Sequence, residues 1–159
     1  MCSSRKSTAI KVLEAMALVA LKKKYPNFPY PPTPSYTDKT SNGLTKCIVD
    51  FLNLSGHHAE RINSMGFAKD NRRKVVDVVG QTRTIGDVTW IKGNTQKGTA
   101  DISATIHGQS VKIEVKCEAT GDRRQSEAQK KYQSQIENAG GKYIIARNFQ
   151  DFFDFFNSP

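Results

Sequence analysis

The chain has 159 residues, of which 37% are hydrophobic and 9% aromatic, which allows one domain with a hydrophobic core and argues against wholesale disorder. Its 24 lysines and arginines outnumber its 15 acidic residues, giving a net charge of +9 and a pI near 9.6. This imbalance favours a polyanionic partner, nucleic acid first and an anionic membrane second.

Cysteine usage and the N-terminal run limit the cellular location. Cys2, Cys47 and Cys117 are odd in number and form no CxxC pair, so neither a disulfide framework nor a zinc site is indicated. The apolar run near the N-terminus contains Lys11 and Glu14, where a signal peptide or membrane span would be uninterrupted. We expect a cytoplasmic protein that does not associate with membranes.

The beginning of the chain combines a helix with a stiff connector. Apolar residues at helical spacing predict an amphipathic helix over residues 7–24, ending in three lysines that suit the helix dipole. Five prolines between Pro26 and Pro34 exclude helix and favour an extended chain. We expect residues 1–41 to be an appendage and residues 42–159 to form the core.

Helices and strands mix in the expected core. A helix rich in Leu, Ile and Phe should end at Ser55–Gly56 and lead into a short strand in HAERIN. Residues 64–97 are rich in Gly, Asn, Thr and basic residues and show only two β-like patches, VVDVV and DVTWI. Then come the strands ADISATI and SVKIEVK, a helix from about 126 to 139, the strand KYIIAR and the aromatic helix FQDFFDFF. This order predicts an α/β fold with a mixed central sheet flanked by helices.

The strands ADISATI and SVKIEVK alternate apolar and polar residues, as strands with one buried face do. If their loop is Gly108–Gln109, or four residues about the same centre, Asp101 faces Lys116 and Ser103 faces Glu114. Asp101, Glu114 and Lys116 then share one face of the hairpin. A three-residue loop would instead move Asp101 to the other face.

Two carboxylates beside an ammonium have two explanations. They suit a hard cation such as Mg2+, which polarises a phosphoryl oxygen and activates water in phosphodiester hydrolysis, while a lysine stabilises charge or orients that water. The alternative is an exposed hairpin face with a cross-strand salt bridge, which contributes under about 1 kcal/mol.

The ordered set GTAD, IEVK and RRQSEAQKKYQSQIENAGGKYIIARNFQDF resembles the VRR-NUC branch of the PD-(D/E)XK nuclease superfamily. In that branch a G-x-x-D hairpin leads to E-V-K, a helix bearing S-x-x-Q, then A-G-G, a strand and an A-R-S/N-x-x-D segment. The resemblance covers roughly residues 44–156. It implies a restriction-endonuclease-like fold, hydrolysis of DNA with Mg2+ or Mn2+, and no small-molecule cofactor. Small members of the branch act as homodimers on branched DNA such as four-way junctions, in replication or repair, in bacteria and in phage-infected cells.

Residue by residue, the resemblance implies that Asp101 and Glu114 bind the divalent metal, with the Val115 carbonyl as a third ligand. Lys116 matches the catalytic lysine of the family. Gln129 matches the glutamine on the helix near the active site.

Gln129 has a structural role as well, because Ser126 and Gln129 form an S-x-x-Q capping box at the start of the predicted helix. The two roles are compatible, since a helix N-terminus beside an active site also attracts phosphate. The sequence departs from the branch at Ala100, where many members have proline, and near Gly43, where the leading helix often carries an acid. Asp50 and Glu60 are alternative sources of that acid.

Basic residues on both sides of the hairpin are expected to contact phosphates: Arg72, Arg73, Lys74, Lys97, Arg123 and Arg124. The alternative for these residues is a solvated basic loop. Two other functions also stay open. One is a basic nucleic-acid-binding module without cleavage activity, and the other is a sequence-specific restriction-type endonuclease whose recognition element would lie in residues 64–97.

Overall fold

The computed structural model describes residues 6–62, 66–93, 96–121 and 123–158. The chain forms two compact units. The first combines Met1–Ile62 with Gly98–Pro159, and the second is the intervening segment Asn63–Lys97. Each unit is described by itself.

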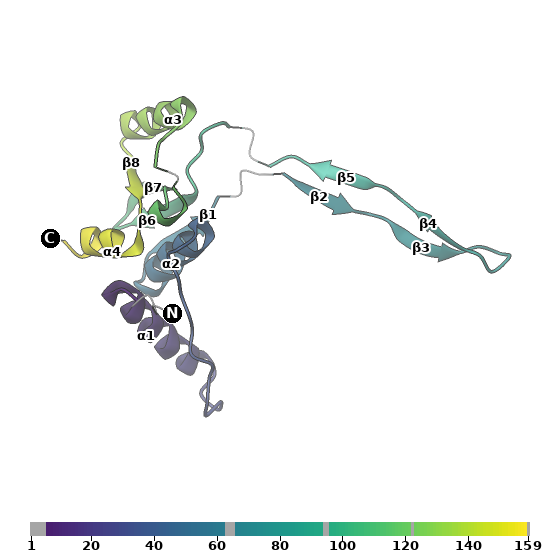
Figure 1. Cartoon of the computed structure of the whole chain (residues 1–159), viewed down its shortest axis with the longest axis horizontal. Coiled ribbons are helices and arrows are strands. Elements are labelled where there is room, and N and C mark those ends of the chain that lie inside the picture. The colour runs from purple at the N-terminus through teal and green to yellow at the C-terminus, as the bar shows by residue number, and fades with distance from the viewer. Residues whose placement is uncertain (1–5, 63–65, 94–95, 122, 159) are drawn as a thin grey trace. The chain divides into compact units, whose positions relative to one another are not determined.

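A four-stranded mixed sheet lies at the centre of the first unit, in the order β1-β6-β7-β8 (Figure 1). β1 (His58–Arg61), β6 (Ile102–Ile106) and β7 (Gln109–Val115) are antiparallel neighbours, whereas β8 (Lys142–Ala146) runs parallel to β7. A parallel pair needs a crossover connection, which α3 (Glu127–Asn138) supplies. The predicted α/β class, with a mixed central sheet flanked by helices, is confirmed.

Helices cover both faces of this sheet. α2 (Ser41–Leu54) and α4 (Phe149–Asn157) pack on one face, and α1 (Thr8–Lys24) packs on these two helices. α3 packs against β8 on the side away from α2 and α4 (Figure 1). No described helix is long and apolar enough to cross a membrane.

The hydrophobic core lies between the sheet and the layer formed by α1, α2 and α4. Its fully buried side chains include Leu13, Leu44, Ile48, Leu52, Ile102, Ile113 and Phe149. Successive residues of a strand point to opposite faces of a sheet. Ser103, Thr105, Lys112 and Glu114 therefore face α3, on the side of the sheet opposite this core.

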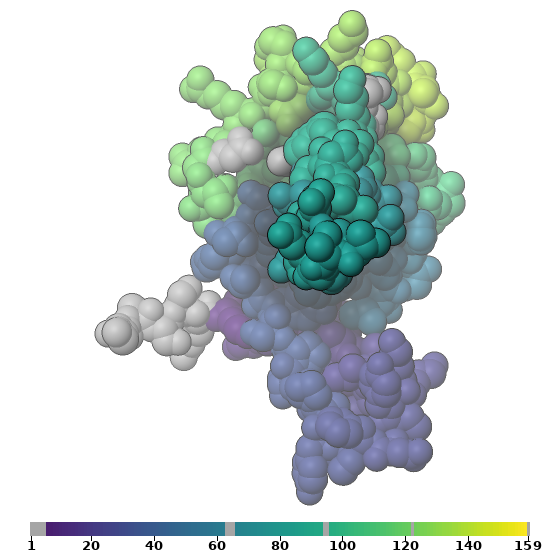
Figure 2. All heavy atoms as spheres, turned by 90° about the vertical axis from the view of Figure 1, so that its right-hand side faces the viewer, coloured from purple at the N-terminus to yellow at the C-terminus, as the bar shows by residue number. Residues whose placement is uncertain are grey.

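The N-terminal region, for which the sequence predicts an appendage over residues 1–41, contributes buried side chains to this core. Ile10 and Leu13 of α1 are buried, and so is Tyr36, whose hydroxyl donates a hydrogen bond of 2.8 Å to Asp50. The expected boundary at residue 41 does not coincide with the division into units, because the apolar face of α1 is buried against α2 and α4. The proline-rich stretch after α1 projects from the unit (Figure 2, violet-blue), with Phe28 and Tyr30 exposed.

The second unit is one antiparallel β-ribbon. β2 (Phe67–Asp70) pairs with β5 (Val88–Ile91), and β3 (Arg73–Val76) pairs with β4 (Thr82–Ile85) (Figure 1). Between these two ladders, the Asn71 N–H donates a hydrogen bond of 3.0 Å to the carbonyl of Asp87, so the pairing continues in one register. The patch DVTWI forms β5, whereas VVDVV spans the end of β3 and the turn.

Candidate active site

The hairpin of β6 and β7 turns one residue earlier than the sequence predicts. Its two-residue loop is His107–Gly108 rather than Gly108–Gln109, and both loop residues have positive φ, 49° and 77°, as a type I′ turn requires. Ser103 consequently pairs with Lys112, and the prediction that it faces Glu114 is wrong. Histidine is one of the non-glycine residues that tolerate a left-handed conformation, which lets the turn form there.

The predicted pairing of Asp101 with Lys116 is wrong for the same reason. Continuing the observed register places Asp101 opposite Glu114. The pairing shifts by two residues, and side chains alternate with a period of two, so the face is unchanged. Asp101, Glu114 and Lys116 therefore still share the face that α3 covers.

Asp101 is held by backbone contacts on both sides. Its carbonyl accepts a hydrogen bond of 2.8 Å from the Ile62 N–H, and its carboxylate accepts one of 2.9 Å from the Val115 N–H. Val115, expected to offer its carbonyl to a metal, thus contacts Asp101 through its amide. These bonds fix a half-buried carboxylate just before β6 begins.

Glu114 is the centre of the cluster and is only 3% exposed. The Lys116 ammonium lies 3.5 Å from its Oε1, the Gln129 amide donates a hydrogen bond to the same oxygen, and the Tyr143 hydroxyl lies 3.4 Å from Oε2. Burial, and to a smaller extent the nearby charge of Asp101, raise the pKa of Glu114 to about 7, although Lys116 acts in the opposite direction.

Gln129 both caps the start of α3 and contacts Glu114. Its Oε1 accepts a hydrogen bond of 2.8 Å from the Ser126 N–H, and Ser126 accepts one in return, which completes the capping box of α3. Because a backbone N–H can only donate, the amide oxygen must face Ser126 and the amide nitrogen is left for Glu114. The start of α3 therefore sets the orientation of the amide that holds Glu114.

Gly98, the first residue of GTAD, lies against the same helix start. Its φ is +79°, and a Cβ built there would come within 2.3 Å of the Ala128 carbonyl oxygen and 2.7 Å of the Gln129 nitrogen. Only glycine combines this conformation with so close an approach. The segment leading to Asp101 is thereby held against the first turn of α3.

Tyr143 is a member of the cluster that the sequence analysis missed. It pairs with Lys112 across the parallel ladder of β7 and β8, which places its side chain on the face of Glu114. Burial raises its pKa, and the charge of Glu114 does so further. The strand KYIIAR was predicted, but its register beside β7 depends on how α3 packs and cannot be read from the strand alone.

The expected phosphate-binding residues fall into separate parts of the structure. Arg123 and Arg124 are exposed in the segment before α3, in the first unit. Arg72, Arg73 and Lys74 are exposed on the ribbon of the second unit, which ends at Lys97.

The residue near the expected position of the leading-helix acid is Gly43, and the structure explains why it has no side chain. A Cβ on Gly43 would come within 2.3 Å of the Thr37 carbonyl oxygen. Asp50 does not lie at the cluster, because its carboxylate pairs with Lys46 of α2 and with the hydroxyl of Tyr36, which precedes α2. Glu60 pairs with Ser103 and so lies on the same sheet face as the cluster.

The donor set fits a hard divalent cation. Asp101 and Glu114 supply the carboxylate oxygens that Mg2+ and Mn2+ prefer. Asp101 raises the pKa of Glu114, so a cation bound by both carboxylates would relieve unfavourable charge. Within the described ranges, no group of three or more His, Cys, Asp or Glu side chains converges. Such an ion would complete its shell with backbone oxygen and water, as Mg2+ commonly does.

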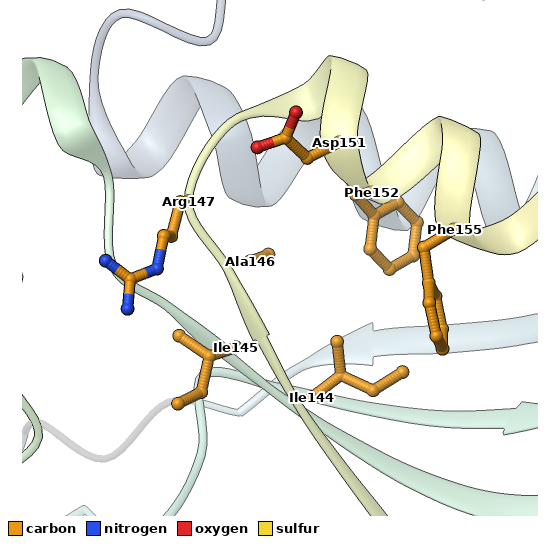
Figure 3. A pocket seen from close by; sticks show the side chains of 7 residues that line it. All are labelled: Ile144, Ile145, Ala146, Arg147, Asp151, Phe152 and Phe155. Carbon is orange, nitrogen blue, oxygen red and sulfur yellow. The ribbon is translucent and has the colours of Figure 1, made fainter.

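A hollow of about 230 Å³ at the end of β8 is separate from this cluster (Figure 3). It lies between the end of the strand and α4, and its lining is Ile144, Ile145, Ala146, Arg147, Asp151, Phe152 and Phe155. None of the residues whose side chains contact the Glu114 carboxylate takes part.

The cluster formed by Asp101, Glu114, Lys116, Gln129 and Tyr143 is thus the place where charged and polar groups converge on the sheet. Comparison of the chain with protein-family models, with curated proteins and with solved structures finds no match.

Proposed function

We propose that the protein is a metal-dependent endonuclease that hydrolyses DNA phosphodiester bonds, with a restriction-endonuclease-like core of the PD-(D/E)XK type. The observation that carries the proposal is the convergence of Asp101, Glu114 and Lys116 on one sheet face, joined by Gln129 from the start of α3. The alternative, a salt bridge on an exposed hairpin face, explains neither the second carboxylate nor the burial of Lys116, which is only 6% exposed.

The cluster gives each residue a distinct task. Asp101 and Glu114 would hold Mg2+ or Mn2+, which when bound supplies charge to polarise a phosphoryl oxygen and lowers the pKa of water. The Lys116 ammonium, already 3.5 Å from Glu114, stabilises negative charge on the phosphate and orients the attacking water. Gln129 positions the Glu114 carboxylate through its capped amide.

Branched DNA is the substrate class we propose. The net charge of +9 favours a polyanion, and Arg123 and Arg124 lie directly before the helix that carries Gln129. A homodimer would pair two such sites and so cut two strands, which suits a junction in replication or repair.

The test is cleavage of labelled four-way junction, flap, linear duplex and single-stranded DNA with Mg2+, Mn2+ or EDTA. We expect metal-dependent cutting, with junction DNA preferred, and a loss of about 100-fold or more in both Glu114→Gln and Lys116→Ala. Glu118→Gln changes an exposed glutamate close by in the sequence and should cut like wild type. Unchanged cutting by Glu114→Gln would refute the site.

A DNA-binding protein without cleavage activity is the alternative, favoured by the absence of a side chain at Gly43. Wild-type protein that binds junction DNA in either metal without cutting it would support this alternative.

A further inference from the structure

The ribbon of the second unit exposes large apolar side chains to solvent. Every residue of its four strands is exposed, among them large apolar ones such as Phe67, Val76 and Trp90. A two-stranded ribbon buries too little to be stable by itself, and clustered exposed apolar groups mark interaction surfaces. These features indicate that the ribbon contacts another molecule.

Both faces of the ribbon mix basic and apolar side chains. Residues paired across the ladders share a face, as Arg73 does with Ile85. One face carries Phe67, Lys69, Arg73, Arg83, Ile85 and Ile91, and the other carries Arg72, Lys74, Val88, Trp90 and Lys92. A ribbon docked on a protein would gather its apolar residues on one face. A ribbon in a DNA groove meets phosphates on both sides, and the major groove admits a two-stranded ribbon.

The uncompensated charge of the ribbon is positive. Asp70 accepts hydrogen bonds of 2.9 and 2.8 Å from the Arg72 guanidinium, and Asp77 pairs with Arg83 at 3.1 Å. Five basic residues of the second unit make no ion pair within the described parts of the chain: Lys69, Arg73, Lys74, Lys92 and Lys97. Asp87 is the only ribbon carboxylate, among the described residues, outside such pairs.

The tip of the ribbon presents two valines to solvent. The Asp77 carboxylate fixes the turn by accepting hydrogen bonds of 3.0 and 2.9 Å from the N–H groups of Val79 and Gln81, and Gly80 has a φ of 79°. Val78 and Val79 are 106% and 79% exposed. Turns favour Gly, Asn, Asp and Ser, so the conformation of the turn does not explain why valine occurs at these two positions. Exposed apolar side chains act as wedges between base steps in several proteins that bend DNA.

We propose that the ribbon binds DNA at a branch point, where Val78 and Val79 pack on the base pair whose stacking the branch interrupts. The unpaired basic residues hold phosphates on either side. In an uninterrupted duplex the wedge must first unstack a base step, whereas a branch already exposes the face of a base pair. The ribbon thus supplies the preference for branched DNA. This inference rests on the proposed substrate class but concerns binding and not cleavage.

The test uses the full chain in EDTA at one fixed salt concentration, with a four-way junction and a linear duplex of the same sequence. We expect Val78→Ser with Val79→Ser to bind the junction about 100-fold more weakly, because each buried valine contributes about tenfold in affinity, and to bind the duplex nearly as wild type does. Arg73→Ala with Lys74→Ala should weaken binding to both DNAs alike. Val19→Ser, which changes an exposed valine of α1, should alter neither.

A second readout follows the bases directly. With 2-aminopurine at the branch, wild type should change its fluorescence on binding, and the double valine variant should not. If the double valine variant lost affinity equally for junction and duplex, or lost none, the proposal would be overturned. A lower sedimentation coefficient of the free valine variant would do so as well, by assigning the tip to contact between copies of the chain. Cleavage, tested by Glu114→Gln, is decided independently, so failure of one proposal is distinguishable from failure of the other.

Discussion

Glu114 is contacted by an ammonium, an amide and a phenol, and the balance of these contacts with burial decides its charge. The three groups stabilise the ionised form, whereas removal from water and the carboxylate of Asp101 disfavour it. The result is a glutamate that titrates near neutral pH. Groups balanced in this way are common where a protein binds a cation or moves a proton.

The raised pKa of Glu114 predicts a specific pH dependence of stability in the metal-free protein. Its pKa rises from 4.5 to about 7 on folding, so between these values the folded protein binds more protons than the unfolded chain. The free energy of unfolding should therefore fall as pH rises through this window, by up to about 3 kcal/mol, and level off above it. Urea denaturation in EDTA at several pH values measures the change.

The variant Glu114→Gln removes the titrating group and should lose this part of the pH dependence. Glu118→Gln, at an exposed position, should keep the wild-type profile. Parallel profiles for wild type and Glu114→Gln would show that burial does not shift this carboxyl. Above the window, Mg2+ should raise the melting temperature of wild type but not of Glu114→Gln, because a ligand that binds only the folded state stabilises it.

At the scale of elements, the first turn of α3 joins the two halves of the cluster. Gln129 caps the helix and holds Glu114, while Gly98 lies against the Ala128 carbonyl and leads to Asp101. The G-x-x-D and S-x-x-Q motifs, distant in sequence, thus meet at one backbone contact.

Gly98→Ala tests this contact. The substitution adds a methyl group where φ is +79° and the Ala128 carbonyl oxygen would be 2.3 Å away, so either the loop or α3 must move. We expect a loss of about 1 to 3 kcal/mol in the free energy of unfolding. The cleavage rate should fall by more than the increase in unfolded protein explains, because Gln129 moves with the helix. Urea denaturation and cleavage assays measure the two effects.

Gly121→Ala is the matched control. Gly121 has a φ of +77° but nothing within 4 Å of an added Cβ. Its substitution by alanine therefore introduces the same backbone strain but no steric clash. Equal effects of the two substitutions on cleavage would contradict a role for the contact with α3.

The elements of the first unit follow from local sequence signals, whereas their pairing does not. Alternation located β6 and β7, and the S-x-x-Q pattern located the start of α3. The hairpin register was missed because it depends on which two residues take positive φ, and His107 was not an obvious choice beside Gly108. The cluster survived this error, since a shift of two residues keeps every side chain on its face.

At the scale of the whole molecule, the excess of basic residues should make DNA binding depend steeply on salt. Each phosphate contact contributes a slope of about one to the plot of log affinity against log salt concentration. Arg123→Ala with Arg124→Ala should therefore lower the slope by about two if both contact phosphates. Binding to junction DNA over a series of salt concentrations measures it.

Lys22→Ala with Lys23→Ala is the control for net charge. These exposed lysines end α1, and their removal takes away the same charge as the arginine pair. The slope should stay close to that of wild type. If both pairs lower it equally, net charge rather than local contact explains the effect.

The division into two units could not be predicted from the sequence. The proline-rich stretch indicated a boundary near residue 41. The apolar spacing of residues 7–24 indicated that one face of α1 packs, but not that this face contacts α2 and α4. The ribbon was missed because its strands bury neither face and so lack the alternation that marks a half-buried strand.

The hydrogen bond between Ile62 and Asp101 has a consequence for how such a protein can diversify. The chain leaves the sheet after Ile62 and is back beside it at Asp101, where a bond of 2.8 Å closes the gap. Everything between enters and leaves at neighbouring points, as an inserted module does. In evolution or by protein engineering, the ribbon can be lengthened, exchanged or grafted while the strand connections of the sheet that holds Glu114 stay unchanged. The core and the ribbon can thus change independently of each other.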